Sequence, residues 1–157
     1  MASECKYPFH EALAKLEAYC AYQERCTKEI QKKLEDWGLS FDDSAEILRS
    51  LQENRFFDDV RFCESFVSGK VRIKRWGRIK IRYELKLKGI KEEFIRKALS
   101  EIDPLVYEEN LKELTQRKWS ETKGDEWTRK AKLHRFLASK GYESDLINEA
   151  LKSVFTT

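Results

Sequence analysis

The chain has 157 residues, a length that suits one compact domain or a short array of small units. Hydrophobic residues make up 41% and charged residues 38%, so a core can form beneath a large solvated surface. The formal net charge of only +3 does not indicate a nucleic-acid-binding protein, so the distribution of charge has to decide that point. With 6 Gly and 2 Pro the chain lacks the turns of a β-sandwich, and stretches rich in Glu, Lys, Leu and Ala favour helices.

Cysteine and histidine positions argue against a metal site. The four cysteines, at positions 5, 20, 26 and 63, form no CxxC pair, and His10 and His134 lie far apart in the sequence. The N-terminus has no secretory pattern, and no apolar run approaches the roughly 18 residues that a membrane helix needs. We therefore expect a cytoplasmic protein with reduced thiols, without a membrane segment, a metal or a cofactor.

The first third of the chain predicts three helices. Phe9, Ala12, Leu13 and Leu16 follow the i, i+3, i+4 spacing of one helix face. Two further helices are predicted within residues 28–51, on either side of a glycine.

The middle third begins at Asp58 or Asp59, either of which can cap a helix that carries Phe62 and Phe66. Residues 70–82 then read KVRIKRWGRIKIR, where apolar and basic side chains alternate. Taken alone, this alternation is typical of a β-hairpin. A helix is favoured after Gly77, and residues 70–76 remain open between hairpin and helix.

The last third starts with Asp103 and Pro104, a favourable cap and first residue of a helix. Leu111 and Leu114 continue that helix, and two more helices are predicted around a glycine in residues 129–154.

A repeat connects the three parts. Gly38, Gly89 and Gly141 are spaced by 51 and 52 residues, and each sits where a helix would end in the left-handed conformation. Apolar residues stand eight and four positions before each glycine: Ile30, Ile81 and Leu133, then Leu34, Leu85 and Leu137. The sequence therefore predicts an all-α fold of three tandem three-helix repeats, covering residues 1–55, 56–102 and 103–157.

Positive charge gathers in the middle repeat. The segment from Gly69 to Lys88 contains nine basic residues and one acidic residue, Glu84. Trp76 and Tyr83 lie among them. Such a cluster attracts polyanions even in a nearly neutral protein, and Trp76 could stack on an exposed base. The predicted binding residues are Lys70, Arg72, Lys74, Arg75, Trp76, Arg78, Lys80, Arg82, Lys86 and Lys88.

An enzyme is not predicted. The sequence holds no GxxxxGK[ST], GxSxG, HExxH or GxGxxG pattern, and neither histidine has a catalytic partner at a motif spacing. We predict no catalytic residue. Trp37, Trp119 and Trp127 are interpreted as core or groove anchors.

Two segments of the middle third carry distinctive motifs: an Asp-Asp run in FFDDVRFCESFV (56–67), and the order Gly, Arg-Ile, Glu-Leu, Lys-Gly-Ile in GRIKIRYELKLKGI (77–90). Both segments resemble the signature of the RecX family of recombinase regulators. The resemblance spans roughly residues 9 to 155. It rests on Asp58, Asp59, Phe62, Phe66, Val67, Gly77, Arg78, Ile79, Glu84, Leu85, Lys88, Gly89 and Ile90.

The resemblance implies helix-turn-helix-like repeats in an elongated, curved, monomeric protein. It implies binding in the groove of a RecA filament on single-stranded DNA. Family members usually inhibit strand exchange, ATP hydrolysis and repressor cleavage by RecA, which places them in homologous recombination, DNA repair and the SOS response.

Two other functions remain open. A direct DNA-binding protein with a helix-turn-helix-like unit would bind duplex DNA without RecA, although few base-reading side chains lie on the second helices. A helical adaptor for another protein is also compatible with a repeat array.

Overall fold

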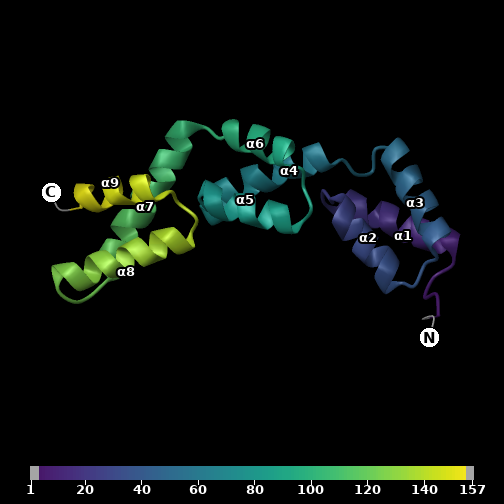
Figure 1. Cartoon of the computed structure of the whole chain (residues 1–157), viewed down its shortest axis with the longest axis horizontal. Coiled ribbons are helices and arrows are strands. Elements are labelled where there is room, and N and C mark those ends of the chain that lie inside the picture. Colours follow the sequence, from purple (N-terminus) through teal and green to yellow (C-terminus); the bar gives the residue numbers. More distant parts are fainter. Residues whose placement is uncertain (1–3, 155–157) are drawn as a thin grey trace. The chain divides into compact units, whose positions relative to one another are not determined.

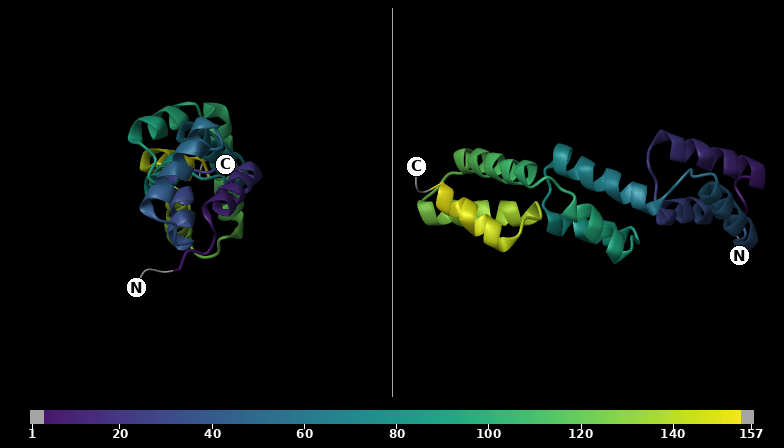
Figure 2. Two further views of the ribbon diagram at one scale, coloured as in Figure 1. Left: turned by 90° about the vertical axis from the view of Figure 1, so that its right-hand side faces the viewer. Right: turned by 90° about the horizontal axis from the view of Figure 1, so that it is seen from above.

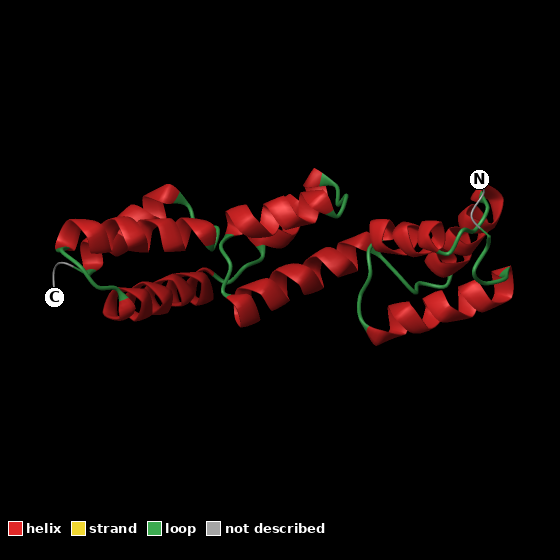
Figure 3. Ribbon diagram, turned by 90° about the horizontal axis from the view of Figure 1, so that it is seen from below, coloured by secondary structure: helices red, strands yellow, loops and turns green. Residues whose placement is uncertain are grey.

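The structure, a computed structural model, describes residues 4–154. Nine α-helices and one π-helical segment, η1, follow one another through this part of the chain, which contains no strand (Figure 1, Figure 3). The helices are α1 (Phe9–Tyr22), α2 (Thr27–Asp36), α3 (Phe41–Glu53), α4 (Asp59–Gly69), η1 (Lys70–Lys74), α5 (Arg78–Leu87), α6 (Glu92–Ser100), α7 (Pro104–Glu121), α8 (Glu126–Ser139) and α9 (Ser144–Ser153). The predicted all-α fold is confirmed. Of the segment left open at residues 70–76, Lys70–Lys74 is helical, Arg75 and Trp76 lie outside any helix, and no hairpin forms.

The described residues form two compact units. The first unit takes the described residues up to Ser65 together with Lys86–Phe94. The second takes Phe66–Leu85 and the described residues from Ile95 onward. The boundaries of the three repeats and the curvature of the array stay predictions.

The three repeat glycines end helices as predicted. Gly38, Gly89 and Gly141 have φ angles of 74°, 73° and 96°, in the left-handed region that a side chain would disfavour. After Gly38, the Leu39 N–H donates to the Leu34 carbonyl at 3.2 Å, and after Gly141 the Tyr142 N–H donates to the Leu137 carbonyl at 3.3 Å. These bonds satisfy carbonyls at the ends of α2 and α8.

The repeat register describes the core. The six apolar residues before the glycines are at most 1% exposed. In the first unit, Ile30 and Leu34 pack against residues of α1 and α3. The cluster consists of Ala12, Leu16, Cys20, Ile30, Leu34, Ile47, Leu51 and Phe57. In the second unit α7, α8 and α9 pack together, as the right-hand view of Figure 2 shows.

Helix starts use the expected side chains. The Asp103 carboxylate accepts a hydrogen bond from the Leu105 N–H at 2.9 Å, with Pro104 as the first residue of α7. At α4, Asp58 is the cap, because its carboxylate accepts from the Val60 and Arg61 N–H groups at 2.8 and 3.2 Å. Asp59 makes a different contact, with Thr27.

The cysteines give a simple check of this core. Cys5 is exposed, whereas Cys20, Cys26 and Cys63 are buried. Burial raises the pKa of Cys26 and of Cys63 to about 11, so at pH 8 these thiols hold little of the reactive thiolate. We expect a disulfide reagent to titrate Cys5 rapidly in the native protein and the other three cysteines only after denaturation. Rapid native labelling of more than one thiol per chain would contradict this core.

Candidate functional site

The basic segment, residues 70–88, begins where α4 passes into η1. Gly69 has φ −65° and ψ −43°, so the chain continues in a helical conformation into Lys70–Lys74. A hydrogen bond of 3.0 Å from the Trp76 N–H to the Lys70 carbonyl closes the wide turn, and Arg75 ends it with φ 55°. Single π-helical turns occur often at functional sites.

The ten predicted binding residues fall into both units. Lys86 and Lys88 belong to the first unit, and the other eight belong to the second. Most of the eight residues in the second unit fall into three groups. Some are exposed to solvent, some lie against the Trp76 ring, and some pair with other parts of the unit and hold the segment in place.

Arg72 and Lys74 are accessible bases of η1. Both are exposed, and neither has an ion pair in the described part of the chain. They project from η1 into solvent and can meet a polyanion without breaking an existing contact.

Trp76 is half-buried and lies between lysines. The Lys70 and Lys80 ammonium groups lie 4.6 and 4.4 Å from the centre of its ring, and Phe66 meets it edge-on at 6.5 Å. These cation–π contacts orient two positive charges beside η1. Stacking of Trp76 on a base would require the lysines to move, and this predicted role stays a prediction.

Arg75 and Arg78 are paired with acids of the third repeat. The Arg75 guanidinium lies 2.9 Å from Glu113, and Arg78 Nη1 lies 2.7 Å from Glu143 Oε2. The Glu143 carboxylate also accepts a short hydrogen bond from the Tyr107 hydroxyl. Burial, with that bond to Glu143, raises the pKa of Tyr107.

Tyr107 connects this network to the backbone of the basic segment. Its hydroxyl oxygen accepts from the Arg78 N–H at 3.1 Å, and the Arg78 guanidinium lies 3.9 Å from the centre of its ring. Asn110 donates to the Val71 carbonyl at 2.9 Å, and the Tyr142 hydroxyl donates to the Arg75 carbonyl at 2.7 Å. Arg75 and Arg78 therefore stabilise the second unit.

A close backbone approach fixes the start of α5. The Gly77 N–H donates to the Lys140 carbonyl at 2.8 Å, and the Ile79 N–H donates to the Gly141 carbonyl at 3.0 Å. The first N–H groups of a helix lack partners within the helix, and here the end of α8 supplies them. A side chain at Gly77 would overlap the Gly141 carbonyl.

Lys86 and Lys88 lie in the first unit and are both paired. Lys86 is 3.6 Å from Glu92, and Lys88 is 3.4 Å from Glu29. Lys28 adds a hydrogen bond of 2.7 Å to the Leu87 carbonyl at the end of α5. Arg82, in the second unit, is half-buried.

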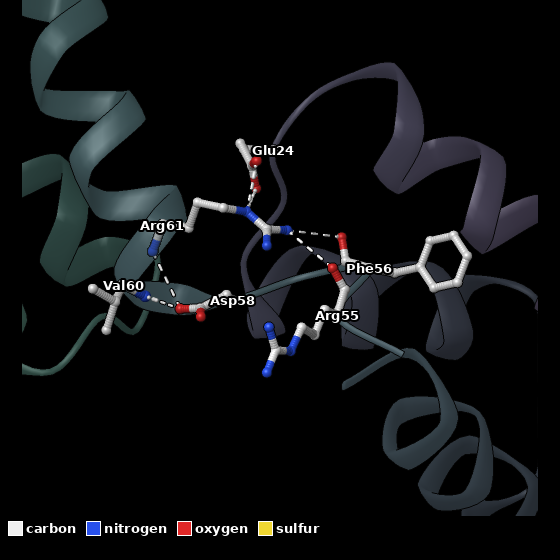
Figure 4. Close-up of polar contacts among 6 residues, drawn as sticks. All are labelled: Glu24, Arg55, Phe56, Asp58, Val60 and Arg61. Atoms are coloured by element: carbon white, nitrogen blue, oxygen red, sulfur yellow. Dashed lines mark hydrogen bonds and ion pairs between the residues drawn. The ribbon is translucent and has the colours of Figure 1, made fainter. Parts of the chain in front are cut away.

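The Asp-Asp pair at the start of α4, Asp58 and Asp59, has a structural role in the first unit. Asp59 accepts from both the N–H and the hydroxyl of Thr27, at 2.8 and 3.1 Å, and so caps α2 of the preceding repeat. Arg61 pairs with Glu24 at 2.7 Å and donates to the carbonyls of Arg55 and Phe56 (Figure 4). Sequence reasoning missed the Asp59–Thr27 and Arg61–Glu24 contacts, because these partners lie 32 and 37 residues apart in the sequence.

The tryptophans divide between packed and exposed. Trp37 meets Tyr7 edge-on at 5.1 Å, and the Arg129 guanidinium lies 3.6 Å from the centre of the Trp119 ring. Trp127 is 82% exposed, so the core alternative is wrong for this residue, and its role as a groove anchor stays a prediction. It stands in the first turn of α8, two residues after the Asp125 cap.

Other kinds of site are not found in the described residues. No three His, Cys, Asp or Glu side chains come together in a way that could hold a metal ion within residues 4–154. Over the same residues, no helix has both the length and the apolar character needed to cross a bilayer.

Comparison with known proteins identifies the family. Residues 58–99 match the family model of the second three-helix domain of RecX, and residues 106–151 match that of the third. A regulatory protein RecX from Prosthecochloris aestuarii is 31% identical over 146 residues, covering 93% of this chain and 95% of the relative. The chain belongs to the RecX family.

Further RecX proteins are similar to this chain. One from Chlorobium phaeobacteroides is 35% identical over 85% of this chain and 86% of its own. A crystal structure described as regulatory protein RecX superposes with a TM-score of 0.83 at 28% identity, covering 92% of this chain and 73% of that one. The RecX family is a regulatory family, and several positions of its signature have a structural role in this chain. Asp59, Arg78 and Lys88 each make a contact that fixes a repeat.

Proposed function

We propose that this chain regulates a RecA recombinase by binding the RecA filament on single-stranded DNA, usually restraining ATP hydrolysis, strand exchange and repressor cleavage. The observation that carries the proposal is the set of bases on and beside η1 that have no ion pair among residues 4–154, in a chain of the RecX family. Arg72 and Lys74 are exposed there, and Trp76 holds Lys70 and Lys80 beside them.

The physical basis is a local positive potential. Residues 66–85 contain seven bases and one acid, although the chain as a whole carries only +3. A filament on DNA is a long polyanion, and a basic surface increases both the rate and the strength of its encounter with such a partner. Regulation then acts by occupying the filament and needs neither a catalytic group nor a cofactor. The protein acts in the cytoplasm, where the filament forms on bacterial DNA.

The test is a charge reversal at the accessible bases. Arg72→Glu combined with Lys74→Glu should weaken binding to RecA-coated oligo(dT) about tenfold at low salt, and the difference should shrink as salt increases. The readouts are fluorescence anisotropy and titration of the DNA-dependent ATPase of RecA. Changing Arg75 or Arg78 is less suitable, because both arginines also stabilise the second unit.

The matched control makes the same charge change elsewhere. Arg135→Glu combined with Lys152→Glu alters two exposed bases of α8 and α9. This variant should bind the filament like the parent. Equal weakening by both variants would mean that only net charge matters, and it would contradict the site. Tight binding of the parent to duplex DNA without RecA would instead favour a direct DNA-binding protein.

A further inference from the structure

The basic segment exposes apolar side chains as well as charge. Ile73 in η1 is 79% exposed, and Ile79 and Tyr83 in α5 are 55% and 61% exposed. In the same helix Ile81 and Leu85 are fully buried, so these two residues form the side of α5 that packs into the core. Ile79 and Tyr83 are four residues apart and therefore lie on one helix face, away from that core.

Phosphate binding gives no reason for this apolar face. Contacts to DNA phosphates come from Lys, Arg and hydrogen-bonding groups such as the Ser, Thr or Tyr hydroxyl, and an exposed isoleucine adds nothing to them. In protein–protein interfaces, by contrast, aromatic and apolar side chains fill the centre, and charged side chains surround them. Ile73, Ile79 and Tyr83 lie in a segment with that composition.

The basic residues near this face indicate the sign of the charge on its partner. Lys70, Arg72, Lys74 and Lys80 have no ion pair in the part of the second unit that the structure describes. Glu84 is the single acid among residues 66–85. Opposite charge speeds encounter and excludes partners of like charge, so the complementary surface is acidic.

We propose that the α5 face formed by Ile79 and Tyr83, together with Ile73 of η1, docks onto an acidic protein surface that has an apolar centre. The inference rests on the proposed function and deepens it, since it makes the protein of the filament, rather than its DNA, the partner of this face. The neighbouring bases surround the contact and orient it.

The experiment removes apolar surface and leaves every charge in place. Ile79→Ser combined with Tyr83→Ser is compared with the parent for binding to three probes: RecA alone, RecA-coated oligo(dT), and oligo(dT) alone. We expect about a tenfold loss or more with both RecA probes, as for central apolar residues of an interface, and no change with oligo(dT) alone. Ile79→Val combined with Tyr83→Phe should keep the parent's affinity.

Trp127→Ser is the matched control. Trp127 is also a large exposed side chain of the second unit, at the opposite end of α8 from Gly141. Since α8 has 14 residues, about 20 Å separate Trp127 from the backbone contact at Gly77. This variant should bind all three probes like the parent, and circular dichroism should show the same thermal midpoint for every variant.

The outcomes are distinct. Unchanged RecA binding by the double serine variant overturns the inference, and so does an equal loss with oligo(dT) alone, which would make the face a nucleic-acid contact. If the parent itself fails to bind RecA-coated oligo(dT), the proposed function fails, and the inference fails with it.

Discussion

Gly77→Ala should lower the free energy of unfolding by about 3 kcal/mol or more. The new Cβ would overlap the carbonyl group of Gly141 and lie 2.5 Å from the Tyr142 nitrogen. These are backbone atoms, so no side-chain rotation can relieve the overlap. Separation of the two segments would also break the bonds from Gly77 to Lys140 and from Ile79 to Gly141.

Thermal unfolding followed by circular dichroism measures this effect. For a chain of this size we expect a decrease of about 6–12 °C in the midpoint. Gly69→Ala is the control, because the added methyl group would meet no other segment within 4 Å and the φ and ψ of Gly69 are helical. Alanine in a helix is favoured over glycine by about 1 kcal/mol, so Gly69→Ala should keep or increase stability. If Gly77→Ala were as stable as Gly69→Ala, the close approach of α5 to Gly141 would be wrong.

Leu137→Ala should cost about 2–5 kcal/mol, because it deletes a fully buried side chain and leaves a cavity. Leu137 stands four residues before Gly141, at the repeat position that Leu34 and Leu85 also occupy. Helices α7, α8 and α9 pack around this part of the second unit, so the site can collapse only in part.

Urea denaturation of Leu137→Ala should show the lower midpoint with little change in slope. Leu105→Ala makes the same chemical change at a side chain that is 74% exposed, and it should alter stability by no more than about 0.5 kcal/mol. Similar losses in the two variants would contradict the burial on which the repeat register depends.

The fold could be predicted from the sequence because its signals are local. Gly38, Gly89 and Gly141 mark helix ends, since their left-handed backbone conformation favours glycine in any context. Asp103 and Pro104 mark a helix start for an equally local reason. The conformation of residues 70–76 could not be predicted, because an alternation of apolar and basic residues suits a strand as well as a wide helical turn.

The candidate site could be predicted only in part. The excess of bases between Gly69 and Lys88 is visible in the sequence, but which bases are available is not. Arg78 meets Glu143 across 65 residues, and Lys88 meets Glu29 across 59, so no local pattern reveals that these charges are paired. Trp127 shows the reverse case, since an aromatic residue at a helix start is buried only if another element packs over it.

The sequence by itself determined the helices, their ends, the repeat and the excess of positive charge, because propensity, capping and periodicity act over a few neighbouring residues. The tertiary structure decided which charges remain free and which apolar side chains stay in solvent. Within residues 4–154, Arg72 and Lys74 have no ion pair, whereas Arg75 and Arg78 are paired with Glu113 and Glu143 of the third repeat. Pairing of these charges depends on which segments, far apart in the sequence, come into contact. The packing of the whole unit determines these contacts.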